Sequence, residues 1–410
     1  MSTFAAVAEK ESGRARSRRR VVVLGSTGSV GTNTLDVVDH FPDRLEIIGL
    51  SAHSNWEPLF EQARRLRPRW VSITDPEAAR RVDRSLLPPE TEFLSGPESV
   101  GRMVADADTD IVVSAIVGSA GLFGTWEALQ AGKTVALANK ETLVMAGARV
   151  KELEARHGGL LLPVDSEHSA IFQALAGHRG PLAECVERIV LTGSGGPFRG
   201  KSRDELKSVR IEEALKHPTW KMGPKISVDS ATLMNKALEV IEARWLFDLP
   251  PEQIEVIVHP ESIVHSFVEF RDGSVLAQLS PPDMRLPIQY ALNYPDRLSG
   301  PARRLDWQAL RVLHFEVPDR ETFAALDLGY EVARAGGTSG AILNAANEAA
   351  VGLFLEGRLA FLDIARVCRA VLEAHAFSPH PYLEELMAAD RWARQEVSRW
   401  TRLPLPSPIP

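Results

Sequence analysis

Four polar residues directly follow an apolar run near the middle of the chain. The run is LLLPV (160–164), and Asp165, Ser166, Glu167 and His168 come after it. On an extended chain Asp165 and Glu167 project to the same side, where two carboxylates seldom lie without a partner. Carboxylate oxygens are suitable ligands for Mg²⁺ or Mn²⁺. The pattern predicts either a divalent metal site or a solvated strand end, at which Asp165 or Ser166 caps a following helix.

Two loops further along the chain also carry polar side chains. LTGSGGPF (191–198) predicts a strand and then a glycine-rich loop around Ser194, whose backbone could wrap a phosphate group. HPTWKMGPK (217–225), which contains His217 and Trp220, is punctuated by proline and glycine and is more typical of a lid than of a core segment.

The next stretch, SVDSATLMNKALEVIEARWLF, predicts a helix with Asp229 or Ser230 as its cap. Helical spacing of three and four residues brings Asn235, Lys236 and Glu239 onto one face. A Lys-Glu pair on a helix surface is the commoner explanation of such spacing. It does not account for the polar loops that precede the helix.

The segment from Arg20 to about Val164 alternates short apolar runs with amphipathic stretches. The strand candidates are VVVLG, LEIIGLSA, RWVSITD, DIVVSAIVG, TVALAN and LLLPV. This alternation predicts an α/β fold with a doubly wound, Rossmann-like parallel sheet and crossover helices. Ligands of such sheets bind beyond the carboxyl ends of the strands, so we expect Asn139, Lys140 and Glu141, which follow TVAL, to lie near a ligand.

The first strand leads into GSTGSVG (25–31), a glycine-rich turn that opens a helix near Val30. Such a turn lets the backbone approach a pyrophosphate at the helix N-terminus, although it is also compatible with an ordinary strand-to-helix connection. After the second strand, residues 51–55 (SAHSN) contain no carboxylate that would repel a 2′-phosphate. This absence favours NADP over NAD, and a plain polar loop is the alternative.

The composition is that of an ordinary globular protein of two or three domains. The chain has 410 residues, with 44% hydrophobic and 25% charged residues, and a formal net charge of −7. The acidic balance argues against general binding of nucleic acid or of a membrane surface. Two cysteines and no apolar run of about 18 residues predict a reducing, cytoplasmic location without a membrane span.

The motifs together resemble those of the 1-deoxy-D-xylulose 5-phosphate reductoisomerase family. They are GSTGSVG, ANKE, PVDSEH, LTGSGGPF, HPTWKMG, SVDSATLMNK with Glu239, HPESIVHS and PDMR. They occur in the order of the family, from about Val21 to Arg285, and GAILNAANEAAVGLFLEGRL in the C-terminal region is also similar. The resemblance implies a homodimeric enzyme of the non-mevalonate isoprenoid pathway. Such an enzyme uses NADPH and Mg²⁺ or Mn²⁺ to rearrange and reduce its sugar phosphate substrate to 2-C-methyl-D-erythritol 4-phosphate.

The resemblance also implies roles for individual residues. The metal ligands would be Asp165, Glu167 and Glu239. The substrate would contact Lys140, Ser166, Glu167, Ser194, His217, Trp220, Ser230, Asn235, Lys236 and Glu239, and the catalytic residues among these would be Lys140, Glu167, His217 and Glu239. The cofactor would lie against Thr27, Gly28, Ser29, Val30, His53, Ser54, Asn55, Asn139, Glu141 and Gly223. Here Ser54 stands where we associate a basic residue with the family.

We expect three domains between loose ends. The predicted boundaries are a disordered tail (1–19), a cofactor domain (20–164), a catalytic α/β domain with the lid (165–295), a linker (296–325), a helical domain (326–400) and a loose tail (401–410). Two other functions are weaker alternatives. A dehydrogenase with a nucleophilic cysteine would need Cys185 or Cys368 in a reactive loop. A non-catalytic nucleotide sensor would have little use for three carboxylates, a lysine and a lid.

Overall fold

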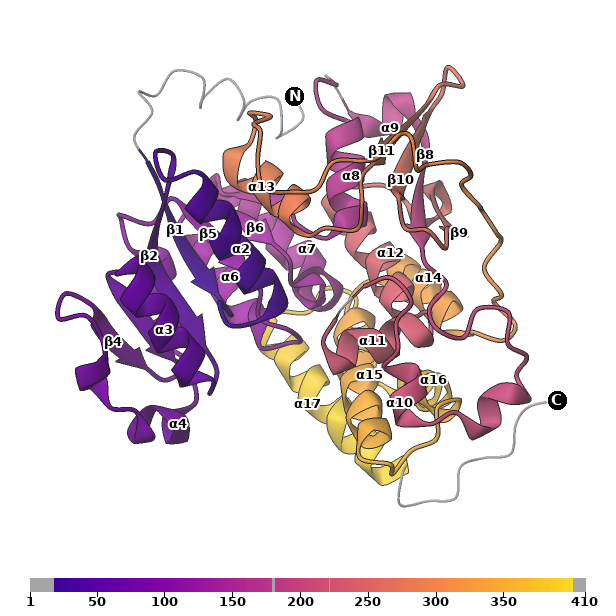
Figure 1. The fold of residues 1–410 in the computed structure, drawn as a ribbon. Helices are drawn as coiled ribbons and strands as arrows, with labels where there is room; N and C mark the ends of the chain where they lie inside the picture. The colour runs from indigo at the N-terminus through magenta and orange to yellow at the C-terminus, as the bar shows by residue number, and fades with distance from the viewer. Residues whose placement is uncertain (1–17, 179–180, 221, 401–410) are drawn as a thin grey trace. The chain divides into compact units, whose positions relative to one another are not determined.

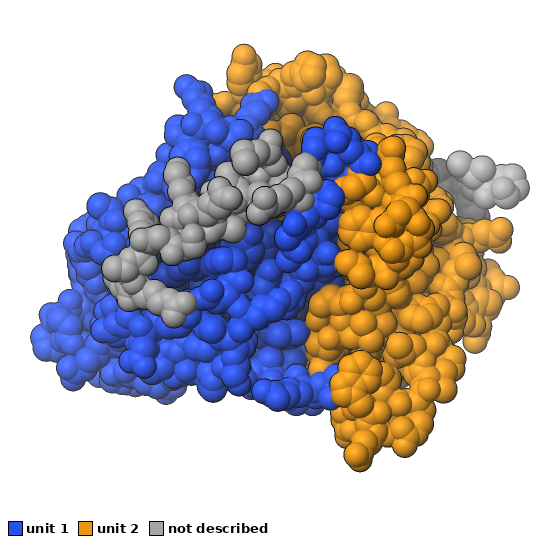
Figure 2. Space-filling model, turned by 90° about the horizontal axis from the view of Figure 1, so that it is seen from above, with its two compact units in different colours: residues 1–139, 150–184, 283–305 blue, residues 140–149, 185–282, 306–410 orange. Residues whose placement is uncertain are grey.

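A computed structural model describes residues 18–178, 181–220 and 222–400. The chain divides into two compact units, and each is built from separate segments (Figure 2). Unit 1 comprises residues 1–139, 150–184 and 283–305, and unit 2 comprises residues 140–149, 185–282 and 306–410. The predicted tails, 1–19 and 401–410, fall almost entirely outside the described residues. The structure also describes no helix that is long and apolar enough to cross a membrane.

Unit 1 contains a parallel sheet of seven strands in the order β4-β3-β2-β1-β5-β6-β7 (Figure 1). The strands are β1 (Arg19–Leu24), β2 (Leu45–Ala52), β3 (Trp70–Ile73), β4 (Glu92–Ser95), β5 (Ile111–Ser114), β6 (Thr134–Leu137) and β7 (Leu160–Pro163). Six of them correspond to the predicted strands, and the α/β doubly wound class is confirmed. The sequence analysis missed β4 because this edge strand buries only Leu94 and so has no apolar run.

Helices cover this sheet in the order that a doubly wound fold requires. They are α2 (Ser29–His40), α3 (Trp56–Leu66), α4 (Pro76–Arg81), α5 (Ser99–Ala105), α6 (Gly121–Gln130), α8 (Ser166–Ala174) and α13 (Arg285–Asn293), with the short turn η1 (Arg84–Leu86). The glycine turn after β1 is tight. Gly25 has a φ of +80°, and a Cβ there would lie 2.8 Å from the carbonyl oxygen of Ala115. A larger residue would therefore push β1 away from the loop after β5.

Unit 1 acquires its last helix from a distant part of the sequence. Helix α13 packs on α2, α8, β6 and β7. Arg44 pairs with Asp296 at 2.6 Å, and the ring of Phe172 lies 5.1 Å from that of Tyr294. These contacts explain why residues 165–184 and 283–305 group with the sheet, whereas the predicted boundaries put 165–295 into a separate domain.

Unit 2 contains a mixed sheet of four strands in the order β11-β10-β8-β9. The strands are β8 (Val186–Gly193), β9 (Ile254–Val258), β10 (Val264–Phe270) and β11 (Val275–Leu279). Strands β8 and β9 are parallel, and the other two pairs are antiparallel. The short elements around them are η2 (Glu205–Ser208), α10 (Ile211–Ala214) and η3 (Pro251–Gln253). The short helix α9 (Leu182–Cys185) spans the chain position at which a segment of unit 1 ends and one of unit 2 begins.

The longer helices of unit 2 form its core. They are α11 (Pro224–Ala231), α12 (Met234–Leu246), α14 (Ala325–Ala335), α15 (Ser339–Leu355), α16 (Asp363–Ala374) and α17 (Leu383–Trp400). Helix α14 packs closely on α12, since a Cβ at Gly329 would lie 2.6 Å from Cα of Ala237. Helix α7 (Lys140–His157) has non-helical torsion angles at Ala146 and belongs to unit 2 up to Arg149.

One helix boundary differs from the prediction. The sequence analysis has a single helix capped by Asp229 or Ser230, but these residues lie inside α11, which begins at Pro224. Proline fits the first helical position because its φ is already helical and its missing N–H is not needed there. The chain then breaks at Leu233, whose φ of 61° is left-handed, before α12 begins.

Candidate active site

The glycine turn of unit 1 presents the N-terminus of α2. Gly28 occupies the N-cap position, where it has no side chain to cap the helix, and is exposed together with Ser29. The first turn of α2 contains no acidic residue. Unpaired backbone N–H groups and the helix dipole favour an anion at such a position. Thr27, Gly28, Ser29 and Val30 therefore lie where the sequence predicts a pyrophosphate.

The neighbouring strand ends carry the other residues that were predicted to contact the cofactor. His53, Ser54 and Asn55 follow β2 and are exposed, and Nδ1 of His53 lies 3.1 Å from Oγ1 of Thr74. Asn139 follows β6 and is buried. Its amide donates hydrogen bonds to the carbonyls of Ile116 at 2.6 Å and Gly118 at 2.9 Å. Asn139 thus shapes the loop after β5.

The acidic segment after β7 is helical from Ser166 onward. Strand β7 ends at Pro163, Asp165 is the N-cap of α8, and the Ser166 hydroxyl donates a hydrogen bond of 2.5 Å to Glu167. The prediction that Asp165 and Glu167 lie on extended chain is wrong, because the helix begins between them. Asp165 makes no capping hydrogen bond through its side chain, which removes the predicted capping role.

Unit 2 brings together the predicted face of α12. Asn235 Nδ2 donates to Glu239 Oε1 at 2.5 Å, and Lys236 Nζ lies 2.5 Å from Glu239 Oε2. The Glu239 side chain is 1% exposed. This burial rules out the alternative of an ordinary surface pair, because the charge of Glu239 must be balanced inside the protein.

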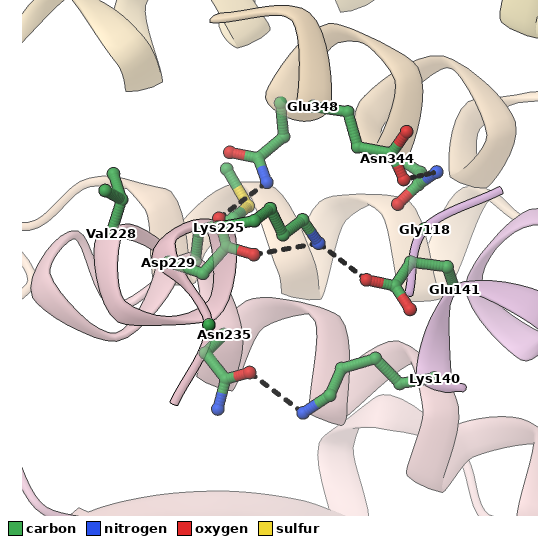
Figure 3. A network of polar contacts seen from close by, with 12 residues as sticks. Gly118, Lys140, Glu141, Lys225, Val228, Asp229, Asn235, Asn344 and Glu348 are labelled. Atoms are coloured by element: carbon green, nitrogen blue, oxygen red, sulfur yellow. Dashed lines mark hydrogen bonds and ion pairs between the residues drawn. The ribbon is translucent and has the colours of Figure 1, made fainter. Parts of the chain in front are cut away.

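Lys140 reaches the same carboxylate from the first turn of α7. Its Nζ lies 2.9 Å from Asn235 Oδ1 (Figure 3). The same atom lies 3.2 Å from Glu239 Oε1. Lys236 also donates to the backbone carbonyl of Thr192, at the end of β8, at 2.5 Å. Two predicted lysines and two predicted acceptors thus form one buried cluster within unit 2.

The glycine-rich loop after β8 runs past the end of α11. Gly195 and Gly196 have φ values of +81° and +70°, and a Cβ on Gly196 would lie 2.6 Å from the carbonyl oxygen of Ser230. Only glycine accommodates both the left-handed backbone and this approach. The loop therefore brings Ser194 and Ser230, which were both predicted to bind substrate, into one neighbourhood.

His217 and Ser194 are linked in a way that fixes their protons. Nδ1 of His217 accepts hydrogen bonds from the backbone N–H groups of Thr219 at 3.2 Å and Trp220 at 2.9 Å. The proton of the neutral imidazole therefore resides on Nε2, which lies 2.8 Å from Ser194 Oγ. Burial lowers the pKa of His217 to about 4, so the ring is neutral at pH 7.

Among the described residues, the Ser194 hydroxyl consequently accepts hydrogen bonds and donates none. It receives the Nε2 proton of His217 and the backbone N–H of Gly196 at 3.2 Å. Its own proton is left to point toward an external acceptor. A phosphate oxygen is an acceptor of this kind.

Trp220 lies in the predicted lid segment, where the ring centroid of His265 is 6.3 Å away. Nε2 of His265 is 2.9 Å from the Ser280 hydroxyl. Gly223 is the N-cap of α11, directly before Pro224. Residue 221 is outside the part of the chain that the structure describes.

Glu141 has a buried partner that sequence reasoning missed. Lys225 Nζ lies 2.6 Å from Glu141 Oε1 and 2.9 Å from Asp229 Oδ2. Burial opposes the charge of Lys225, but Asp229, Glu141 and Glu348 outweigh burial and raise the pKa of this lysine. Burial likewise opposes ionisation of Glu141, and Lys225 nevertheless keeps the pKa of Glu141 below its usual value. The helical spacing of Lys225 and Asp229 was the only local signal.

The two cysteines do not provide a nucleophile. Cys368 lies inside α16, and burial raises the pKa of its thiol far above neutrality. Cys185 ends the short helix α9. Neither side chain belongs to the buried cluster or to the loops around Ser194 and His217, so the cysteine-dependent dehydrogenase loses its support.

Comparison with known proteins agrees with this arrangement over most of the chain. Residues 21–147 match the family described as 1-deoxy-D-xylulose 5-phosphate reductoisomerase. Residues 161–247 match the C-terminal domain of the same reductoisomerase, and residues 279–396 match the DXP reductoisomerase C-terminal domain. The chain is thus similar to this family in all three of its predicted structured regions.

Individual relatives give the same result. The chain is 54% identical over 377 residues to the 1-deoxy-D-xylulose 5-phosphate reductoisomerase of Chlorobium chlorochromatii, covering 92% of this chain and 98% of the relative. The solved enzyme of Zymomonas mobilis in complex with NADPH is 43% identical, with a TM-score of 0.87. The match covers 94% of this chain and 99% of the solved one. A DOX-P reductoisomerase in complex with NADPH, fosmidomycin and magnesium is 39% identical, also with a TM-score of 0.87 and coverage of 94% and 98%. This chain belongs to the 1-deoxy-D-xylulose 5-phosphate reductoisomerase family.

Proposed function

We propose an assignment of residues to the reaction of this enzyme, the NADPH- and metal-dependent conversion of 1-deoxy-D-xylulose 5-phosphate to 2-C-methyl-D-erythritol 4-phosphate. The buried cluster around Glu239 carries the assignment. A sealed carboxylate with two lysines and an amide supplies charge and hydrogen bonds that a surface pair could not, because the low local dielectric strengthens them.

The chain's need for NADPH and metal is tested directly by following NADPH absorbance. Oxidation should require both 1-deoxy-D-xylulose 5-phosphate and Mg²⁺ or Mn²⁺. With NADH, kcat/KM should fall by about tenfold to a hundredfold, because each lost charge-assisted hydrogen bond to the 2′-phosphate contributes about 1.5–3 kcal/mol. If NADPH is bound but never oxidised with substrate and metal present, the protein is a nucleotide sensor and the enzymatic assignment fails.

Asp165, Glu167 and Glu239 are the metal ligands in this assignment. Three carboxylates provide the oxygen donors that Mg²⁺ and Mn²⁺ prefer, which fits the expected ion. When bound, such an ion polarises a carbonyl group and stabilises negative charge on oxygen. Lys140 and Lys236 supply the positive charge that balances this buried carboxylate.

Replacing Glu239 with glutamine should weaken metal binding by at least about tenfold. Glutamine keeps the shape of the side chain but removes its charge, and it leaves Lys140 and Lys236 to repel the cation. Calorimetric titration with Mg²⁺ measures the affinity independently of turnover. The matched control is Glu255→Gln, at an exposed glutamate of β9 that pairs with Arg188 of β8. Unchanged Mg²⁺ affinity in Glu239→Gln would remove Glu239 from the ligand set.

The substrate phosphate is bound by Ser194, Ser230, Asn235 and Lys236. The support is the donor arrangement within unit 2: the outward proton of Ser194, the lysine beside the end of β8, and the close passage of the glycine loop by Ser230. Neutral His217 fixes the Ser194 hydroxyl and is not a proton donor of the imidazolium type. Ser230 completes the set from α11.

Lys236→Ala should raise KM for the sugar phosphate by about tenfold to a hundredfold, because a charged hydrogen bond to the phosphate is lost. The kcat/KM for the analogue without a phosphate should change much less. Steady-state kinetics with both substrates separate these effects, with Lys207→Ala at an exposed lysine as control. Equal losses for both substrates would mean that Lys236 supports the fold rather than the phosphate.

The remaining substrate and cofactor contacts follow the same logic. Lys140 donates a proton or a hydrogen bond to a substrate oxygen, Ser166 holds a hydroxyl, and Trp220 covers the bound substrate and excludes water. Thr27, Gly28, Ser29 and Val30 hold the pyrophosphate, and His53, Ser54 and Asn55 face the 2′-phosphate. Asn139, Glu141 and Gly223 are further cofactor contacts in this assignment.

The enzyme acts as a homodimer in the cytoplasm. Family resemblance supports the dimer, and so does β11, which ends the order of the described strands in the sheet of unit 2. This strand (VLAQL) carries no charge, and Val275 and Leu276 are 54% and 48% exposed. An uncharged apolar edge strand is prone to pair with a second copy. A chain of this length with only two cysteines is consistent with a reducing compartment.

Leu276→Glu should shift the protein toward the monomer, because a charge on the edge strand opposes pairing of two copies. Light scattering coupled to size exclusion at several protein concentrations measures the shift. Leu86→Glu, at an exposed leucine of unit 1, should leave the mass unchanged. A wild-type protein that remains monomeric at micromolar concentration would contradict the dimer.

A further inference from the structure

A lysine to which the sequence analysis assigns no role holds together two elements of unit 2. Lys225 lies in the first turn of α11, two residues after Gly223, and its side chain is 18% exposed. It contacts Glu141 in the first turn of α7 and Asp229 one turn further along α11. Figure 3 shows the Lys225 ammonium group between these two carboxylates.

The carboxylates on either side of Lys225 are nearly sealed from solvent. The side chains of Glu141 and Asp229 are 5% and 1% exposed. Asp229 accepts a second hydrogen bond, of 2.8 Å, from the amide of Asn347 on α15. One cation therefore joins the start of α7 to α11, and Asp229 continues the connection to α15. Lys225 therefore supplies positive charge to two buried carboxylates at once.

Glu141 is the chain neighbour of Lys140. Both belong to the first turn of α7, where the position of one backbone unit fixes that of the next. The Lys140 ammonium group lies 2.9 Å from Asn235 and 3.2 Å from Glu239. The contact of Lys225 with Glu141 therefore helps to determine the backbone position of Lys140 and the direction in which its side chain reaches α12.

We propose that Lys225 is a positioning residue that holds Glu141, and through it Lys140, in the geometry needed for turnover. This inference rests on the function proposed above, in which Lys140 contacts the substrate and Glu141 lines the cofactor. Lys225 also ties the first turn of α11 to the first turn of α7. The inference gives Lys225 no direct contact with substrate or cofactor, since its described partners are Glu141 and Asp229.

Lys225→Gln tests this role with a side chain that can still donate one hydrogen bond but carries no charge. We expect kcat to fall by at least about tenfold, since small misplacements of a catalytic group cost up to about a hundredfold. KM for the sugar phosphate should change less than kcat does, because Lys225 contacts Glu141 and Asp229 and not the phosphate-binding side chains themselves, although Ser230 is the chain neighbour of Asp229. Lys207→Gln, at an exposed lysine paired with Asp204, is the control.

A double-mutant cycle distinguishes positioning through Glu141 from a general loss of structure. If Lys225 acts through Glu141, then Lys225→Gln combined with Glu141→Gln should lower kcat no further than the more damaging single variant. Multiplied losses, or an unchanged kcat in folded Lys225→Gln, would overturn the inference. If the wild-type protein itself shows no activity, the proposed function is overturned rather than this inference alone.

Glu141→Gln serves alone if Lys225→Gln does not fold. This variant keeps Lys225 paired with Asp229 and removes only the charge that links α11 to α7. A fall in kcat of about tenfold, with less than a twofold change in KM for the sugar phosphate, is expected. Wild-type kcat in Glu141→Gln would show that the link does not position Lys140.

Discussion

A carboxylate sealed inside unit 2 constrains the elements around it. Glu239 is 1% exposed, and an ionised group at that depth is tolerated only where cations and donors surround it. Lys236 comes from the same helix, but Lys140 comes from the start of α7 and must reach α12 across the fold of the unit. Asn235 fills the space between them by accepting from Lys140 and donating to Glu239. The need to balance the charge of Glu239 therefore fixes the start of α7, which carries Lys140, against the face of α12 that carries Asn235, Lys236 and Glu239.

The same balance extends to the neighbouring loops. Lys236 donates to the carbonyl of Thr192, which ties the end of β8 to α12 and fixes where the glycine loop around Ser194 begins. The second buried lysine, Lys225, repeats the arrangement between α7 and α11 with Glu141 and Asp229. In unit 2, Lys225 and Lys236 thus each contact two buried partners that lie on different elements. Such joints are rigid because breaking either contact leaves a charge without compensation.

Sequence patterns could predict those parts of the molecule whose physical causes are local. Strands buried on both faces produce apolar runs, so six strands of the parallel sheet were predicted, whereas the exposed edge strand β4 had no such signal. Helical spacing also predicted the shared face of Asn235, Lys236 and Glu239. Proline at the start of α11 and the left-handed backbone at Leu233 place the helix boundaries at other residues than predicted. Helix α8 begins at Ser166, whereas the sequence analysis expected extended chain from Asp165 to Glu167. The pairing of Lys225 with Glu141 spans 84 positions in the chain, and no local pattern contains it. Roles taken from the family motifs remain predictions, to which the structure adds the partners of each side chain within its unit.

The order in which the chain is synthesised does not match the order in which unit 1 is assembled. The seventh strand of its sheet is complete at Pro163, but α13, which packs on β6, β7, α2 and α8, begins only at Arg285. A ribosome adding about 5–20 residues per second delivers this helix roughly 6–25 s after the strand. During that interval the growing chain exposes the apolar surface that Ile288 and Leu292 later cover. The sheet of unit 1 is therefore complete before its last covering helix exists, and that helix can pack on the sheet only after residue 293 has been added.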